Sequence, residues 1–190
     1  MRANGPGQSS LLLLDVIDIL NKSHVSYAVI GALAASFHGA IRASVDADAL
    51  VFFQNTQKET RDLLNQLTQS GFAATEKRGD QDDPITGVIN IHDSYHNRVD
   101  LLMGIRKMPQ DIFSRTIDSP FLGARIRVVG LEDFIAMKIF AGGPHDIEDV
   151  KNALQVSAPK INLPLLKKLA LHYGKPTLKK LKILLKKSHS

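Results

Sequence analysis

The chain contains no cysteine, which excludes disulfide bonds, thiolate metal sites and cysteine nucleophiles. It also lacks any apolar run of the roughly 18 residues that a membrane-crossing helix requires. The early run Leu11–Leu14 is short, Asp15 and Asp18 interrupt the apolar residues after it, and no pattern of small residues marks a signal-peptide cleavage site. We therefore expect a cytoplasmic protein that has no membrane partner.

Acidic residues are missing from the last part of the chain. Residues 150–190 contain 10 lysines and no acid, whereas residues 1–149 contain 14 Lys+Arg and 19 Asp+Glu. The net charge is therefore +10 in the last segment and −5 before it. Such one-sided charge is typical of a surface that binds a polyanion such as RNA. The alternative is a packed helical appendage with a solvated face, and without an aromatic stacking platform we expect no sequence-specific readout of single strands.

What the chain does contain indicates one domain with an appendage. A length of 190 residues and a hydrophobic content of 44% are ordinary for a soluble globular protein. The polar, Gly- and Pro-containing residues 1–8 are expected to be disordered. We assign residues 9–157 to the main domain and residues 158–190 to a basic helical C-terminal extension.

The central stretch Tyr27–Phe53 has the layout of a nucleotide site. An apolar strand leads into Gly31, and a short helix is predicted from Ala32 to His38. Glycine lets the backbone approach a ligand closely, and a helix N-terminus presents free N–H groups that suit phosphate. The sequence therefore predicts phosphate binding at Gly31 and Ala32.

Acidic residues interrupt two apolar strands. Asp46 and Asp48 lie two apart, so their side chains point to the same side of the strand. Neighbouring buried carboxylates repel each other and lose water, and a divalent cation such as Mg²⁺ or Mn²⁺ compensates both effects. Asp100 is placed similarly among Val99 and Leu101. The alternative is that these acids lie at a solvated strand end or on a solvated sheet face.

The segment IGALAASFHGAIRASVDADALV resembles the signature of the DNA polymerase β-like nucleotidyltransferases. It is most similar to small bacterial members, including the toxin-type transferases of abortive-infection and toxin–antitoxin systems. Their pattern is a Gly-Gly or Gly-Ser turn, about a dozen residues, Asp-x-Asp and a third acid on a later strand. Leu131–Val150 is similar to a later segment of the group with a lysine and aspartates. The resemblance covers roughly Tyr27 to Val150.

This resemblance implies an α/β (α+β) fold, with a small mixed sheet flanked by helices, and a set of site residues. The catalytic metal ligands would be Asp46, Asp48 and Asp100. The residues near the nucleotide phosphates would be Gly31, Ala32, Arg42 and Lys138. The chain departs from the family at Ala32, where a serine hydroxyl that could bond a phosphate is missing. Lys138 could instead face solvent or pair with Asp146 and Asp149.

The function expected from these features is metal-dependent transfer of a nucleoside monophosphate from an NTP to a hydroxyl. The basic extension favours RNA, such as a tRNA 3′ end, as the acceptor, and a protein hydroxyl is the alternative. The departure at Ala32 supports a second hypothesis, a weak or inactive member of the fold that binds nucleotide or RNA. A metal-dependent nuclease is a third, against which the Gly31 turn argues.

Overall fold

Seven strands form a single mixed sheet in the computed structural model, which describes residues 1–40, 44–54 and 56–187. The strands are β1 (Ser26–Val29), β2 (Asp46–Phe52), β3 (Ala73–Arg78), β4 (Gly87–His92), β5 (Arg98–Leu102), β6 (Ile117–Phe121) and β7 (Ala124–Val128). Their order across the sheet is β3-β4-β5-β2-β1-β7-β6. Strand β2 runs parallel to β5 and antiparallel to β1, and β1 runs parallel to β7. The mixed sheet confirms the expected α/β class.

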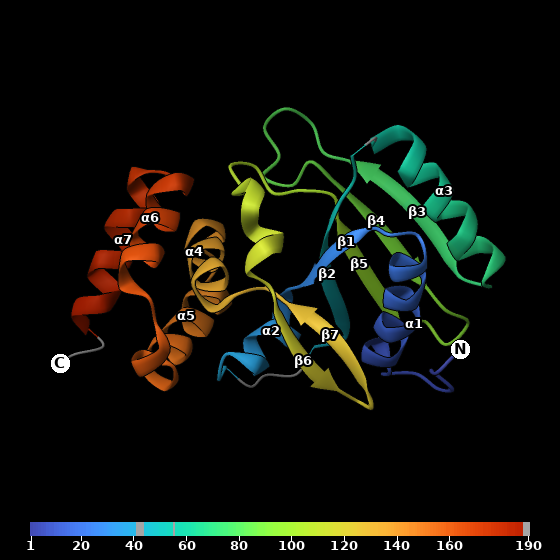
Figure 1. The fold of residues 1–190 in the computed structure, drawn as a ribbon, viewed down its shortest axis with the longest axis horizontal. Coiled ribbons are helices and arrows are strands. Elements are labelled where there is room, and N and C mark those ends of the chain that lie inside the picture. The colour runs from blue at the N-terminus through green and yellow to red at the C-terminus, as the bar shows by residue number, and fades with distance from the viewer. Residues whose placement is uncertain (41–43, 55, 188–190) are drawn as a thin grey trace.

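Helices pack on the sheet, and a further group of helices lies beyond one end of it (Figure 1). They are α1 (Ser9–Lys22), α2 (Gly31–Phe37), α3 (Thr56–Gln69), α4 (Leu131–Ala141), α5 (Pro144–Val156), α6 (Leu163–Tyr173) and α7 (Lys175–Lys187), with short 3₁₀ helices η1 (Gln110–Arg115) and η2 (Ala158–Lys160). Helices α1 and α3 lie near β3 to β5, whereas α4 to α7 form a group beyond β1 and β7. Within the described ranges, no helix is long and apolar enough to span a membrane.

The central strands are buried because their sequence is apolar on both faces. Ala28, Val29, Ala49 and Leu50 have no exposed surface. Strands β1 and β2 therefore read as continuous apolar runs, as fully covered strands do. The two acids at the start of β2, Asp46 and Asp48, are the exception to this pattern, and both are only half-buried.

The basic C-terminal helices pack on the main domain through α4. Leu166, Leu169 and Ala170 of α6 are buried, and the ring of Tyr173 stacks on Phe140 of α4 at a centroid distance of 5.0 Å. Burial of several apolar side chains, each worth about 1.5–3 kcal/mol, fixes this extension against α4. The boundary between residues 157 and 158 stays a prediction. At the other end of the chain, Arg2 pairs with Asp15 of α1.

Residues 109–118, for which the sequence favours a short helix or turn, contain the 3₁₀ helix η1 and, from Ile117, the start of strand β6. Asp118 and Pro120 have low strand propensity, but β6 pairs along its length with β7, from Ile117↔Val128 to Phe121↔Ala124. Proline is tolerated here because β6 is the edge strand of the sheet. The pairing with β7, and not local propensity, therefore decides the conformation of this segment.

Candidate functional site

The three acids that the sequence singled out meet on one face of the sheet. Asp46 and Asp48 lie on β2, and the parallel register with β5 places Asp100 beside Asp48. One carboxylate oxygen from each residue lies within 4.8 Å of those of the other two. Three carboxylates at this separation form an all-oxygen donor set, which fits a hard divalent cation such as Mg²⁺ or Mn²⁺.

The electrostatics of this cluster also fit a cation. Burial raises the pKa of Asp48 to about 6, and the negative charges of Asp46 and Asp100 contribute to this rise, against the opposing effect of Lys138 and Arg98. A carboxylate in this state is ionised at lower pH when a cation is bound beside it. The fold therefore leaves Asp48 with a charge that its own neighbours do not fully compensate.

Gly31 lies directly against the carboxylate of Asp48. Its φ of 64° is in the left-handed region, and a Cβ atom at this position would stand 2.9 Å from Cγ of Asp48 and overlap its Oδ2. Only glycine fits, because any side chain would collide with a member of the acidic cluster. The adjacent Ala32 is buried within α2. The structure thus places Gly31 beside the acids, and the binding of phosphate there stays a prediction.

Lys138 reaches the same region from α4. Its ammonium lies 2.7 Å from Oδ1 of Asp146 and 2.9 Å from Oδ2 of Asp149, both on α5. The other carboxylate oxygen of Asp146 accepts a hydrogen bond from the backbone N–H of Gly143 at the start of α5. Lys138 is therefore not solvated: the pairing with Asp146 and Asp149 that the sequence left open is present, and it fixes the lysine near Asp48.

A cavity of about 380 Å³ joins these groups. Gly31, Asp48, Lys138 and Asp146 line it, and the remaining lining is apolar. The apolar side chains are Ile30, Pro84, Ile85, Leu102, Ile105, Met137, Phe140 and Ala141. The volume lies in the range typical of small-molecule sites. Sequence reasoning missed this apolar lining, because its side chains come from four separate segments.

The loop that contributes Pro84 and Ile85 is fixed by Arg106. The backbone N–H of Arg106 donates to the carbonyl of Pro84 at 2.7 Å, and its guanidinium donates to the carbonyls of Asp83 and Asp80. These contacts hold the C-terminal end of the loop against the cavity.

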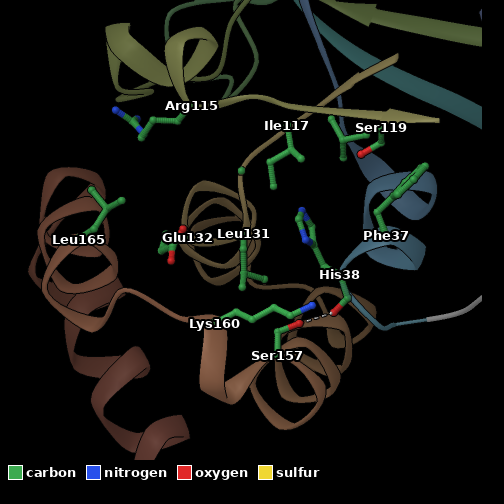
Figure 2. A pocket seen from close by; sticks show the side chains of 12 residues that line it. Phe37, His38, Arg115, Ile117, Ser119, Leu131, Glu132, Ser157, Lys160 and Leu165 are labelled. Atoms are coloured by element: carbon green, nitrogen blue, oxygen red, sulfur yellow. Dashed lines mark hydrogen bonds between the residues drawn. The ribbon is translucent and has the colours of Figure 1, made fainter. Parts of the chain in front are cut away.

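A larger cavity, of about 480 Å³, lies elsewhere, and none of the three acids lines it (Figure 2). His38 borders it and is 6% exposed, its Nε2 lies 2.8 Å from the carbonyl of Val129, and its ring packs on Phe134. Burial lowers the pKa of His38. A neutral imidazole held in this way is a packing residue.

Two residues of the acidic cluster were missed by sequence reasoning. Arg98 bonds both oxygens of Asp100, and Asn90 of β4 donates to Oδ1 of Asp100 at 2.8 Å. The signal for Arg98 was its position two residues before Asp100, on the same face of the strand. Asn90 has no such local signal, because strand pairing brings it beside Asp100. Arg42, the remaining predicted residue, lies outside the described residues.

Exposed lysines cover the outer helices. They are Lys167, Lys168, Lys175, Lys179, Lys182 and Lys186. Lys180 is half-buried, and its ammonium lies beside Gly142 at the C-terminal end of α4, 3.4 Å from where a Cβ atom would stand. Phe140 and Ala141 of the same helix end line the smaller cavity. The lysine-bearing surface therefore begins close to the cavity that holds Asp48.

The model of a nucleotidyltransferase family, described as nucleotidyltransferase of unknown function (DUF6036), matches residues 12–183. The chain belongs to this family, which covers the acidic cluster and both helices of the basic extension. This confirms the resemblance to the polymerase β-like nucleotidyltransferases. No curated protein matches the sequence.

Solved structures share the fold at low sequence identity. The antibiotic-resistance factor ANT(2″)-Ia, solved in complex with adenylyl-2″-tobramycin, is 14% identical, with a TM-score of 0.57 over 87% of this chain and 96% of that one. An antigenic nucleotidyltransferase-like protein from Paracoccidioides brasiliensis is 14% identical, with a TM-score of 0.56 over 97% and 95%. The lincosamide adenylyltransferase LnuA, lincomycin-bound, is 14% identical, with a TM-score of 0.52 over 81% and 99%. These likenesses establish the nucleotidyltransferase fold.

Proposed function

We propose that this protein is a metal-dependent nucleotidyltransferase that moves a nucleoside monophosphate from an NTP to a hydroxyl acceptor. The observation that carries the proposal is the convergence of Asp46, Asp48 and Asp100 into one cluster, of which Asp48 lines a cavity together with Gly31 and Lys138. The family supports a transferase more than a nuclease.

In the proposed reaction the acceptor oxygen bonds to the α-phosphorus while the bond from that phosphorus to the bridging oxygen of pyrophosphate breaks. Asp46 and Asp48 would hold a divalent cation, and Asp100 is the third carboxylate of the cluster. That cation would supply Lewis-acid stabilisation of the charge on the α-phosphate. Pyrophosphate leaves, and the acceptor proton is lost to solvent or to a carboxylate of the cluster.

The cavity is lined by both charged and apolar side chains, which suits the phosphates and the base of a nucleotide. Lys138 would meet the phosphates, and the side chains of Ile85, Ile105, Met137 and Phe140, which line the same cavity, would bury the base. None of these four side chains carries a hydrogen-bonding group that reads a base edge. Apolar pockets discriminate between similar ligands by only about 10–200-fold. We therefore expect modest selection among the four NTPs.

For the acceptor, we propose RNA, such as a tRNA 3′ end. The support is the lysine-bearing surface of α6 and α7, which begins near the cavity at Lys180. Polyanion affinity of this kind depends on the number of phosphate contacts and falls with salt. Adenylyl-2″-tobramycin and lincomycin, the ligands bound in the structures of ANT(2″)-Ia and LnuA, are small molecules, so a small-molecule or protein hydroxyl is the competing outcome of the test.

The test is transfer of label from each of four α-³²P NTPs, with Mg²⁺ or Mn²⁺, onto total tRNA and onto the protein itself. Asp48→Asn keeps the shape of the side chain and removes its charge, and Asp62→Asn on the exposed face of α3 is the matched control. Label that disappears in Asp48→Asn and persists in Asp62→Asn supports the proposal. Label that is equal in both variants contradicts it.

A second candidate function is nucleotide binding without transfer. It is favoured by the buried pairing of Lys138 with Asp146 and Asp149, which already engages this lysine, and by the missing hydroxyl at Ala32. It predicts saturable binding of NTP in equilibrium dialysis with no labelled product under any metal. Product formation in the assay above rules it out.

A further inference from the structure

The guanidinium of Arg98 lies on the same face of the sheet as the three acids and is held there by its hydrogen bonds to Asp100. Along the parallel pairing of β2 with β5, Asp48 is the partner of Asp100, and Asp46 is the partner of Arg98. Side chains two apart on a strand share a face, so these four residues form a square of three carboxylates and one guanidinium. The charges of Asp46, Asp48 and Asp100 all act on Arg98.

The oxygens of Asp100 are largely occupied by protein donors. Oδ1 accepts from Nε of Arg98 at 2.9 Å and from Nδ2 of Asn90 at 2.8 Å, and Oδ2 accepts from Nη2 of Arg98 at 2.6 Å. A carboxylate has about four lone-pair positions, so three of them are taken. The fork of two parallel N–H···O bonds is the strongest arrangement an arginine offers a carboxylate.

The other two acids differ from Asp100. Oδ1 of Asp46 accepts one hydrogen bond, from the hydroxyl of Ser44 at 2.7 Å. Among the residues that the structure describes, no side chain donates a hydrogen bond to Asp48, which instead faces Gly31 and the cavity. The coordinating capacity of the cluster is therefore concentrated on Asp46 and Asp48.

We propose that Arg98 is a positioning residue that holds Asp100 out of metal coordination, so that the site binds one divalent cation on Asp46 and Asp48 and not two. A cation on Asp100 would have to sit beside the guanidinium, on the single lone-pair position that the three hydrogen bonds leave open. Arg98 then supplies a permanent positive charge where a second metal would otherwise stand. This inference rests on the proposed metal site and gives Asp100 a different role from the one the resemblance implies.

The side chain of Arg98 is 45% exposed, so the guanidinium also has a face open to solvent. Its Nη1 group makes none of the hydrogen bonds to Asp100 and can meet an anionic substrate. Asp100, itself held by Asn90, orients this group through its two hydrogen bonds with Arg98. Each of the two side chains therefore positions the other.

The test counts Mn²⁺ ions bound to the full chain, without nucleotide, from the loss of the free Mn²⁺ signal in electron paramagnetic resonance. We expect one bound Mn²⁺ in the wild type and two in Arg98→Gln, with the second binding at least tenfold more tightly than any second ion in the wild type. Arg98→Gln/Asp100→Asn should return the count to one, because Asp100 supplies the new site.

Two further variants distinguish the positioning role of Arg98 from an effect of net charge and from an effect of misfolding. Arg78→Gln removes a positive charge from β3 that pairs with Glu76, and it should leave the count at one. Arg98→Lys keeps the charge but cannot form the fork, and should take up a second ion with intermediate affinity even if Arg98→Gln does not fold.

Two Mn²⁺ ions of similar affinity on the wild type, or one ion on both Arg98 variants, would overturn the inference. Failure of the wild type to bind Mn²⁺, or binding that survives Asp46→Asn/Asp48→Asn, would instead overturn the metal site of the proposed function. The two failures are therefore distinguishable in one titration.

Discussion

Burial raises the pKa of two carboxylates, Asp133 and Asp48, which the protein compensates in different ways. Asp133 is 1% exposed, and both of its oxygens accept hydrogen bonds from Arg115, at 2.6 and 2.8 Å. Asp48 has no such partner among the described side chains, and its pKa is raised to about 6. Arg115 borders the larger cavity and Asp48 the smaller one. The difference indicates where a ligand is needed: the protein neutralises Asp133 itself and leaves Asp48 to a cation.

The largest expected effect comes from removing the charge of Asp48. Asp48→Asn should lower nucleotidyl transfer by on the order of 10³-fold or more, because the ligand that faces the cavity is lost. Initial rates of label transfer at saturating Mg²⁺ measure this effect. Loss of less than tenfold would show that Asp48 is not part of the reacting site.

Breaking the ion pair between Arg115 and Asp133 should reduce stability and leave nucleotidyl transfer nearly unchanged. Arg115→Met leaves Asp133 buried without its partner and should reduce the free energy of unfolding by about 3–5 kcal/mol. Urea denaturation followed by circular dichroism measures this loss. Transfer per folded molecule should stay within a few-fold of the wild type, since Arg115 does not line the cavity of Asp48. If Arg115→Met lost transfer activity at unchanged stability, Arg115 would belong to the reacting site and not to a structural ion pair.

The stability of the metal-free protein should depend on pH through Asp48. Because its folded pKa of about 6 lies above the ordinary value near 4, the folded state binds more protons between these pH values than the unfolded state. The contribution of Asp48 to the free energy of unfolding is therefore fully present below about pH 4. This contribution, on the order of 3 kcal/mol, is lost as the pH rises through 6.

Urea unfolding in EDTA at pH 4.5 and pH 7 measures that dependence, with Asp48→Asn as the control in which this contribution disappears. Added Mn²⁺ should restore stability at pH 7, because it binds the ionised folded form. A wild-type profile identical to that of Asp48→Asn would mean that Asp48 is already compensated within the protein, as Asp133 is.

The smallest effect concerns the lysine-bearing surface of α6 and α7. Lys179→Glu/Lys182→Glu should weaken binding of total tRNA by roughly tenfold at low salt and reduce the slope of log affinity against log salt. Lys22→Glu/Lys77→Glu, with the same charge change on α1 and β3, is the control. Filter binding at several salt concentrations measures both, and equal losses in the two variants would indicate a non-specific effect of net charge.

Much of the fold could be predicted from local patterns. The apolar residues around Asp46–Asp48 and around Asp100 indicated β2 and β5, and the apolar strand and short helix on either side of Gly31 indicated β1 and α2, since hydrophobic patterning is a local property. The same patterns singled out Asp46, Asp48 and Asp100, because an acid within an apolar strand stands out from its neighbours. The register of β2 with β5 could not be predicted in this way, since it depends on how distant segments pair.

The sequence by itself determined the asymmetry of charge, the glycine turn, the three acids and the family to which they point. Only the tertiary structure decided that Arg98 and Asn90 donate hydrogen bonds to Asp100. It also decided that Asp146 and Asp149 form ion pairs with Lys138, and that four distant segments line a largely apolar cavity. The physical reason is that propensity and periodicity act between near neighbours in the chain. Hydrogen bonds, ion pairs and cavities form between residues that packing brings together, and no single segment encodes them.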